Sequence, residues 1–141
     1  MAEGAYGKMG IARLYCLIFG IAYLAVAGLE AITQDALMDA IGLEFEPMQN
    51  AIHWAVGVVT LLAFFGSENT ARIVARAVGF VFLAITIWGM ASPSSIGEFL
   101  GYDHNLPPIY NIVHFLTALA ALFAGFASRK APAEASPPEA A

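Results

Sequence analysis

Four apolar runs in a chain of 141 residues limit the possible folds more than any other feature. Each run holds about the twenty residues that a helix needs to cross roughly 30 Å of hydrocarbon. The runs are Ile11–Leu29, Met48–Gly66, Ile73–Ala91 and Ile109–Phe126. Because backbone groups in lipid must be hydrogen-bonded within their own segment, the runs predict helices. Composition agrees, since 60% of the residues are hydrophobic and only 12% are charged, about half the charged fraction of soluble domains.

The predicted fold is an all-α integral membrane protein with four transmembrane helices in an up-down-up-down bundle. Short connections between successive helices favour antiparallel neighbours. We expect a flexible N-terminus over residues 1–10, the transmembrane domain over 11–128, and a disordered cytoplasmic tail over 129–141. After Lys130 this tail contains only Ala, Pro, Glu and Ser, a composition that cannot bury a core.

The basic residues predict the orientation of the chain in a bacterial cytoplasmic membrane. They are Lys8, Arg13, Arg72, Arg76, Arg129 and Lys130. The two remaining loops, Glu30–Pro47 and Ser92–Pro107, carry neither Lys nor Arg. By the positive-inside rule both termini are cytoplasmic and these two acidic loops are outside. The net charge of −5 and the absence of a basic stripe argue against nucleic-acid binding.

The N-terminus has an alternative interpretation as a signal peptide. A basic start, an apolar stretch and Ala25-Val-Ala27 form the expected order of features. The apolar run is long for a signal, and its removal would leave three helices with one unpaired. We therefore expect this segment to remain as the first transmembrane helix.

Local signals in the loops predict caps and short surface helices. Apolar residues at helical spacing predict a surface helix over Thr33–Ile41. A capping box, Ser95 to Glu98, predicts a second one that ends at Leu100. Asn69 or Thr70 is expected to cap the third transmembrane helix.

A repeated motif opens the second and fourth apolar runs. The spacing P-x-x-N-x-x-H occurs at Pro47–His53 and again at Pro108–His114. Further matches follow in register: Leu61, Ala63, Phe65 and Ser67 correspond to Leu122, Ala124, Phe126 and Ser128. The repeat predicts a bundle built from two repeated hairpins of like direction.

The Asn and His residues of the motif are the candidate site. Helical geometry places Asn50 and His53 on one face, and Asn111 and His114 on the corresponding face of the fourth helix. In a structural interpretation, each Asn caps its helix and each His hydrogen-bonds to the cap or to a neighbouring helix. In a functional one, the four residues are candidates for cofactor binding, since ionisable side chains inside a membrane are often functional.

Two cofactors are compatible with these histidines. His53 and His114 at equal depth could provide the two axial ligands of a b-type haem. A metal site could instead combine them with Asp103 or Glu46, with His104 as a further ligand. The alternatives remain open at the level of sequence.

Motifs for catalysis are absent from the sequence. It has no Gly-rich phosphate loop, no H-E-x-x-H, no C-x-x-C and no Ser-His-acid set. No catalytic residues are therefore predicted, and Cys16 is expected to be a buried structural thiol. We expect a non-enzymatic accessory or structural subunit that contacts the lipid bilayer and other membrane protein subunits or copies of itself. A small-solute channel or carrier, formed as an oligomer, is an alternative.

Three segments together resemble a known family. They are Ala12-Arg-Leu-Tyr-x-Leu-x-Phe-Gly20, the Asn-x-x-His-x-x-x-Gly of Asn50–Gly57, and Asn111-Ile-Val-His114. They are similar to a group of small bacterial four-helix membrane proteins described as domain of unknown function 4383. The resemblance runs from Ile11 to Phe126 and implies four spans with the Asn/His motif on the second and fourth. Ala118 replaces the family's glycine after the second His, and the family implies no activity.

Overall fold

A computed structural model describes residues 9–33, 36, 40, 44 and 46–127 of the chain. Its helices are α1 (Ile11–Thr33), α3 (Pro47–Phe65), α4 (Glu68–Ala91), α5 (Pro93–Leu100) and α6 (Pro108–Phe126). All except α5 are long and apolar enough to cross a membrane, which confirms the four predicted spans and the all-α membrane fold. The surface helix predicted over Thr33–Ile41 and the predicted terminal segments fall almost entirely outside the described residues.

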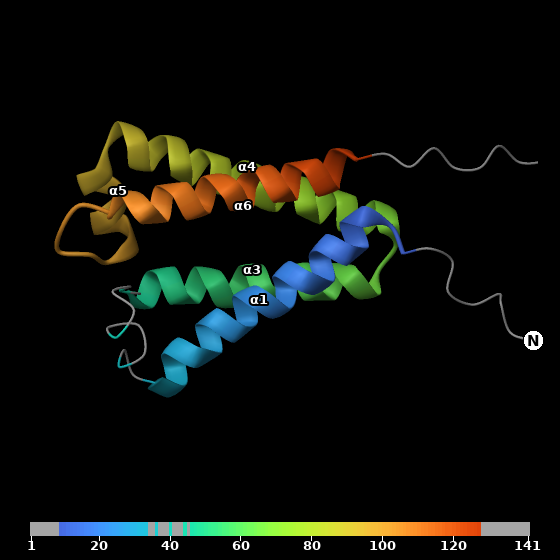
Figure 1. The fold of residues 1–141 in the computed structure, drawn as a ribbon, viewed down its shortest axis with the longest axis horizontal. Helices are drawn as coiled ribbons and strands as arrows, with labels where there is room; N and C mark the ends of the chain where they lie inside the picture. Colours follow the sequence, from blue (N-terminus) through green and yellow to red (C-terminus); the bar gives the residue numbers. More distant parts are fainter. Residues whose placement is uncertain (1–8, 34–35, 37–39, 41–43, 45, 128–141) are drawn as a thin grey trace, which may run out of the picture.

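The four long helices pack as two pairs. Figure 1 shows α1 beside α3 and α4 beside α6, and these are the most extensive helix contacts. The two pairs meet through smaller contacts of α4 with α1 and α3 and of α6 with α1. Successive long helices run in opposite directions along the molecule (Figure 1). The internal repeat stays a prediction.

Glycines allow the backbones to approach closely within each pair. A Cβ atom at Gly20 in α1 would stand 2.9 Å from the backbone nitrogen of Leu61 in α3. A Cβ at Gly79 in α4 would stand 3.0 Å from the backbone nitrogen of Leu122 in α6. Larger residues at either position would force the helices apart. The glycines therefore allow the two helices of each pair to pack closely.

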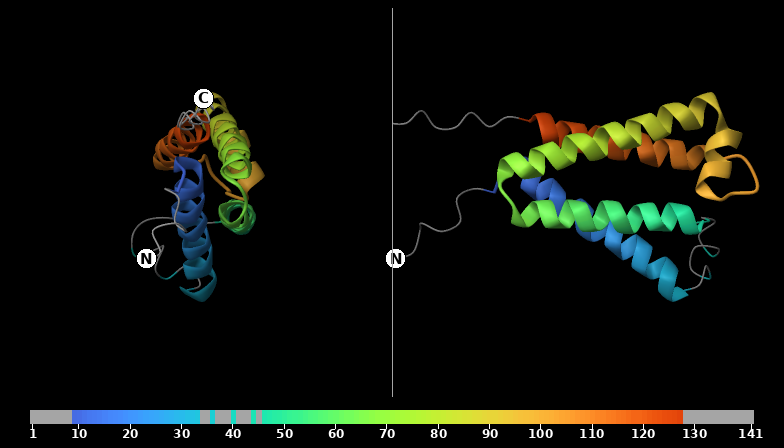
Figure 2. Two further views of the ribbon diagram at one scale, coloured as in Figure 1. Left: turned by 90° about the vertical axis from the view of Figure 1, so that its right-hand side faces the viewer. Right: turned by 180° about the vertical axis from the view of Figure 1, so that it is seen from behind.

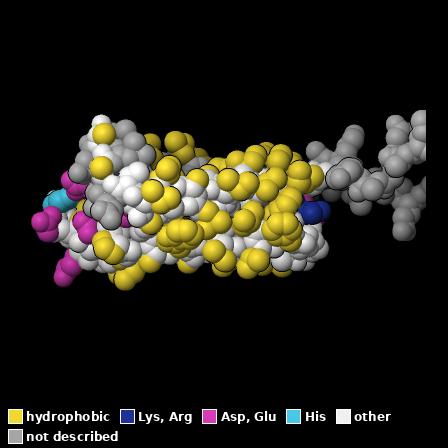
Figure 3. All heavy atoms as spheres, turned by 90° about the horizontal axis from the view of Figure 1, so that it is seen from below, with side chains coloured by type: hydrophobic (Ala, Val, Ile, Leu, Met, Phe, Trp, Pro, Cys, Tyr) yellow, Lys and Arg dark blue, Asp and Glu magenta, His cyan; other side chains and the backbone are white. Residues whose placement is uncertain are grey.

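The surface of the bundle is apolar between two charged ends. Large side chains such as Ile18, Leu62 and Phe123 are more than half exposed, as a lipid-facing surface requires. Figure 3 shows hydrophobic side chains over the body, acidic side chains at one end and basic ones at the other. We call these the acidic end, which carries Glu44 and Asp103, and the basic end, which carries the arginines of α1 and α4.

At the basic end, charged side chains satisfy the ends of neighbouring helices. The Glu68 carboxylate accepts hydrogen bonds from the backbone nitrogens of Ala12 (3.0 Å) and Arg13 (3.2 Å) at the start of α1. Arg13 Nε donates to the Phe64 carbonyl at the end of α3 (3.0 Å). Arg76 Nε donates in the same way to the Gly125 carbonyl of α6 (2.8 Å). These bonds pair backbone groups that a helix end leaves unsatisfied.

Two of the predicted caps are wrong. Helix α4 begins at Glu68, and Ser67 Oγ accepts from the Thr70 backbone nitrogen at 3.1 Å. Ser67 is therefore the cap, instead of Asn69 or Thr70. The predicted capping box is also wrong, because α5 begins at Pro93 with Ser92 as its N-cap, so Ser95 already lies inside the helix.

The loop that contains α5 forms a small folded cap on the acidic end. Ile96, Leu100 and Leu106 are almost completely buried there. Gly101 ends α5 with a left-handed φ of 103°, and its backbone nitrogen bonds to the carbonyl oxygens of Gly97 and Glu98. This conformation is favourable for glycine and disfavoured for residues with a side chain.

Glu68→Ala tests the capping of α1 by α4. Loss of the carboxylate leaves two backbone nitrogens of α1 without these acceptors, so we expect unfolding to be easier by about 1–2 kcal/mol. Thermal unfolding of the detergent-solubilised protein measures the change. Glu98→Ala is the matched control, because Glu98 is exposed on α5. Equal stability of the two variants would contradict the capping role.

Candidate functional site

The Asn residues of the repeated motif do not cap their helices. Proline occupies the first turn of α3 and of α6, which places the N-caps at Glu46 and Pro107, and neither helix has a side-chain cap. The predicted capping by Asn50 and Asn111 is therefore wrong. Asn111 instead packs against α4, where a Cβ at Gly89 would stand 2.0 Å from its Oδ1 atom. Within the described residues, the buried Oδ1 atom of each Asn has no hydrogen-bond partner.

Both motif histidines line one pocket, as their shared predicted depth suggested. His53 is 8% exposed and His114 is 6% exposed. The pocket has a volume of about 310 Å³ and lies between α1, α3, α4 and α6. Its lining residues are Phe19, Ala22, Tyr23, Val26, Gln49, His53, Phe82, Ile109, Tyr110, Val113, His114 and Thr117. Asn50 and Asn111 are not among them.

Aromatic rings connect the two imidazoles. Tyr23 stacks on His53 with ring centroids 6.1 Å apart, and on Phe82 with centroids 5.7 Å apart. Phe82 in turn contacts His114 at 5.4 Å. Sequence reasoning missed Tyr23 and Phe82, because they come from α1 and α4, outside the repeated motif, and no local pattern distinguishes them from other core aromatic residues.

The residues proposed for a metal site do not converge. Neither Glu46 nor Asp103 nor His104 lines the pocket that holds the two buried histidines. In the parts of the chain that the structure describes, no three His, Cys, Asp or Glu side chains form a group able to hold a metal ion.

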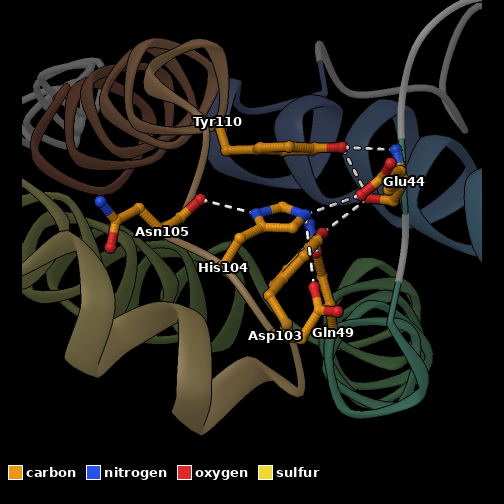
Figure 4. A network of polar contacts seen from close by, with 7 residues as sticks. Glu44, Gln49, Asp103, His104, Asn105 and Tyr110 are labelled. Atoms are coloured by element: carbon orange, nitrogen blue, oxygen red, sulfur yellow. Dashed lines mark hydrogen bonds and ion pairs between the residues drawn. The ribbon is translucent and has the colours of Figure 1, made fainter.

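A polar network at the acidic end includes two residues that line the pocket, Gln49 and Tyr110 (Figure 4). The Tyr110 hydroxyl donates to the Glu44 carbonyl oxygen at 2.5 Å and accepts from the Glu44 backbone nitrogen at 2.7 Å. The Tyr102 hydroxyl donates to the same carbonyl at 2.6 Å and also contacts Gln49 Oε1. Burial raises the pKa of Tyr102 above its ordinary value, so it remains a protonated donor. Because Tyr110 and Gln49 line the pocket, the network fixes two of its polar residues.

His104, whose side chain is partly exposed, joins this network between Asn105 and Glu44, as Figure 4 shows. Its Nδ1 atom is 2.9 Å from the Asn105 carbonyl oxygen and its Nε2 atom is 3.0 Å from Glu44 Oε2. Both partners accept hydrogen bonds, and only the imidazolium can donate from both nitrogens. The Asn105 carbonyl, and next the Glu44 carboxylate, raise the pKa of His104 above its ordinary value.

The fold and the pocket define a small helical membrane protein with buried histidines between two helix pairs. The family described as Domain of unknown function (DUF4383) matches residues 27–127, and the chain belongs to this family. The matched range includes both Asn/His motifs and confirms the family suggested by the sequence, and the Ala12–Gly20 segment lies outside it. Comparison with curated proteins and with solved structures gives no match.

The bonds of His104 predict a pH-dependent contribution to stability. Because the folded-state pKa is raised, the contribution is complete below the unfolded pKa of about 6.5 and is lost as the pH rises through the higher folded value. We expect the unfolding temperature of the wild type to fall over this range relative to that of His104→Gln. Parallel pH profiles of the two proteins would rule out the contribution.

Proposed function

We propose that this protein is a non-enzymatic integral membrane protein that binds a small lipid-soluble molecule in the pocket between its two helix pairs. The observation that carries the proposal is the pocket of about 310 Å³, with His53 and His114 buried in an otherwise mainly apolar lining. Ligand sites commonly combine an apolar wall with a few convergent polar groups. The apolar surface of the four long helices supports a ligand that comes from the lipid bilayer.

The geometry favours a ligand smaller than haem. A cavity of about 150 Å³ holds one benzene molecule, so 310 Å³ suits one substituted ring better than a macrocycle. Tyr23 and Phe82 occupy the space that links the two imidazoles, and ligation of one iron by both histidines would require these rings to move. Among the described residues, no Lys or Arg lines the pocket to pair with propionates.

An Ala22→Phe variant tests ligand binding directly. Ala22 is exposed on α1 and lines the pocket, so a phenyl ring there fills the volume without disturbing the core. We expect N-phenyl-1-naphthylamine, a neutral aromatic probe, to stabilise the wild type in a saturable way, by about 2.7 kcal/mol at one hundred times its Kd. Ala22→Phe should lose this effect, and Ala84→Phe, at an exposed site on α4 outside the pocket, should keep it.

Two results would overturn this proposal. One is equal stabilisation of all three proteins, which would indicate that the probe acts through the detergent or lipid. The other is an absorption spectrum with a Soret band that disappears in both His53→Ala and His114→Ala, which would establish the haem alternative instead.

An accessory role in a larger membrane assembly is a second candidate, favoured by the outer face of α1. A Cβ at Gly28 would meet no described atom within 4 Å, and Ala25 on the same face is exposed. Small residues on a lipid-facing helix permit close approach of another helix. The partner would be a second copy of this chain or a different subunit. An oligomeric channel or carrier stays a prediction of the sequence.

Gly28→Leu tests the α1 face as a self-association site. The larger side chain should prevent close helix contact, so we expect a severalfold loss of dimer in lipid nanodiscs, measured by chemical cross-linking. Ala84→Leu on α4 serves as the control and should associate as the wild type does. A wild-type protein that is entirely monomeric would count against a homo-oligomer.

A further inference from the structure

The pocket lies at the seam where α1 diverges from the other pair. Figures 1 and 2 show α1 near α4 and α6 at the basic end and progressively farther from α6 toward the acidic end. The two walls of this seam are the Phe19–Val26 stretch of α1 and the Ile109–Thr117 stretch of α6. Ile109 and Val113 line the pocket and are about half exposed. The pocket is thus accessible from the apolar side of the bundle, where a bilayer would lie.

The lining excludes a charged head group. In the part of the chain that the structure describes, no Asp, Glu, Lys or Arg lines the pocket, so a phosphate or carboxylate there would be buried without a counter-charge from these residues. Burial of an unpaired charge is strongly unfavourable. Among lipid-soluble molecules, this favours neutral head groups over phospholipids and fatty acids.

The aromatic lining favours a flat ring. Phe19, Tyr23, Phe82 and Tyr110 contribute aromatic side chains to the pocket, together with the two imidazoles. Aromatic faces and edges attract other π-systems in stacked or tilted arrangements. An aliphatic alcohol would fill the same space without these interactions.

His114 supplies a hydrogen-bonding group that no described residue uses. It is 6% exposed and lines the pocket. Its Nδ1 atom is fully buried and has no hydrogen-bond partner within the described segments, so a ligand oxygen reaches this atom only after the imidazole ring turns. Thr117, one turn further along α6, also lines the pocket. A neutral imidazole has one donor and one acceptor nitrogen. It can therefore donate to a carbonyl oxygen or accept from a hydroxyl group, which are the polar groups of a quinone and of its reduced quinol.

Building on the binding function proposed above, we propose that the ligand is an isoprenoid quinone or quinol. Its ring lies in the pocket against Tyr23 and Phe82, and its oxygen is hydrogen-bonded to His114. Its tail leaves between α1 and α6 into the bilayer. The volume of about 310 Å³ accommodates the ring and leaves the tail in lipid. No electron transfer is implied, because binding alone accounts for the chemistry of the lining.

The test uses the full chain in nanodiscs of neutral phospholipid, with decylubiquinone as the probe. Decanol, which has a neutral head but no ring, and lauric acid, which has a charged head, are the comparison ligands. Ligand-dependent shifts of the unfolding temperature give the apparent Kd. We expect saturable binding of decylubiquinone at least tenfold tighter than that of either comparison ligand. Ala22→Phe should abolish this binding, and Ala84→Phe should retain it.

The role of His114 is tested separately with His114→Leu, which removes the imidazole while keeping an apolar side chain of similar bulk. Loss of one hydrogen bond to the ligand should weaken decylubiquinone binding about tenfold. Imidazole ¹⁵N chemical shifts of the wild type provide a second readout, and the His114 signal should move on addition of decylubiquinone. This readout does not depend on how well the variant folds.

The outcomes show whether only the quinone assignment fails or whether the proposed binding function fails as well. If decanol or lauric acid binds as tightly as decylubiquinone, and Ala22→Phe abolishes that binding, the pocket is a ligand site but the quinone assignment is wrong. If none of the three ligands binds saturably and the probe used for Ala22→Phe above also fails, both proposals are wrong. An unchanged His114 signal with saturating decylubiquinone would remove His114 from the site.

Discussion

Close approach of backbones at glycine is the constraint on which the rest of this bundle depends. Gly20 brings α1 against α3, and Gly79 brings α4 against α6. Between the two pairs the contacts are fewer, and ring side chains such as Tyr23 and Phe82 occupy the space. Large planar side chains do not fill a seam between helices as tightly as interlocking small ones do. The pocket lies where tightly packed pairs meet through bulky groups.

At the basic end, the charged side chains bind the ends of neighbouring helices. Glu68 binds the first backbone nitrogens of α1, and Arg13 and Arg76 bind the last carbonyl groups of α3 and α6. Helix ends inside or near a bilayer have few water molecules to satisfy them. The chain has few charged side chains. Hydrogen bonding of arginines to helix-end carbonyl groups explains why the basic residues of the described spans lie mainly at one end.

The sequence predicted the spans well and the site only in part. Hydropathy is a local property, so four long apolar runs were sufficient to place the membrane helices. The motif spacing also identified His53 and His114, which do share a pocket. The assignment of Asn50 and Asn111 as caps failed because proline in the first turn moved each helix start upstream. Tyr23 and Phe82 could not be predicted, since their role arises from how the two pairs pack against each other.

Because α1 diverges from α6, a ligand would enter the pocket from the lipid phase. A site that faces hydrocarbon equilibrates with molecules dissolved in the membrane, where apolar compounds are far more concentrated than in water. Its occupancy follows their mole fraction in the lipid and changes little with their aqueous concentration. Even a weak intrinsic affinity would then be enough to keep such a site filled, and the protein would respond to the composition of the membrane itself.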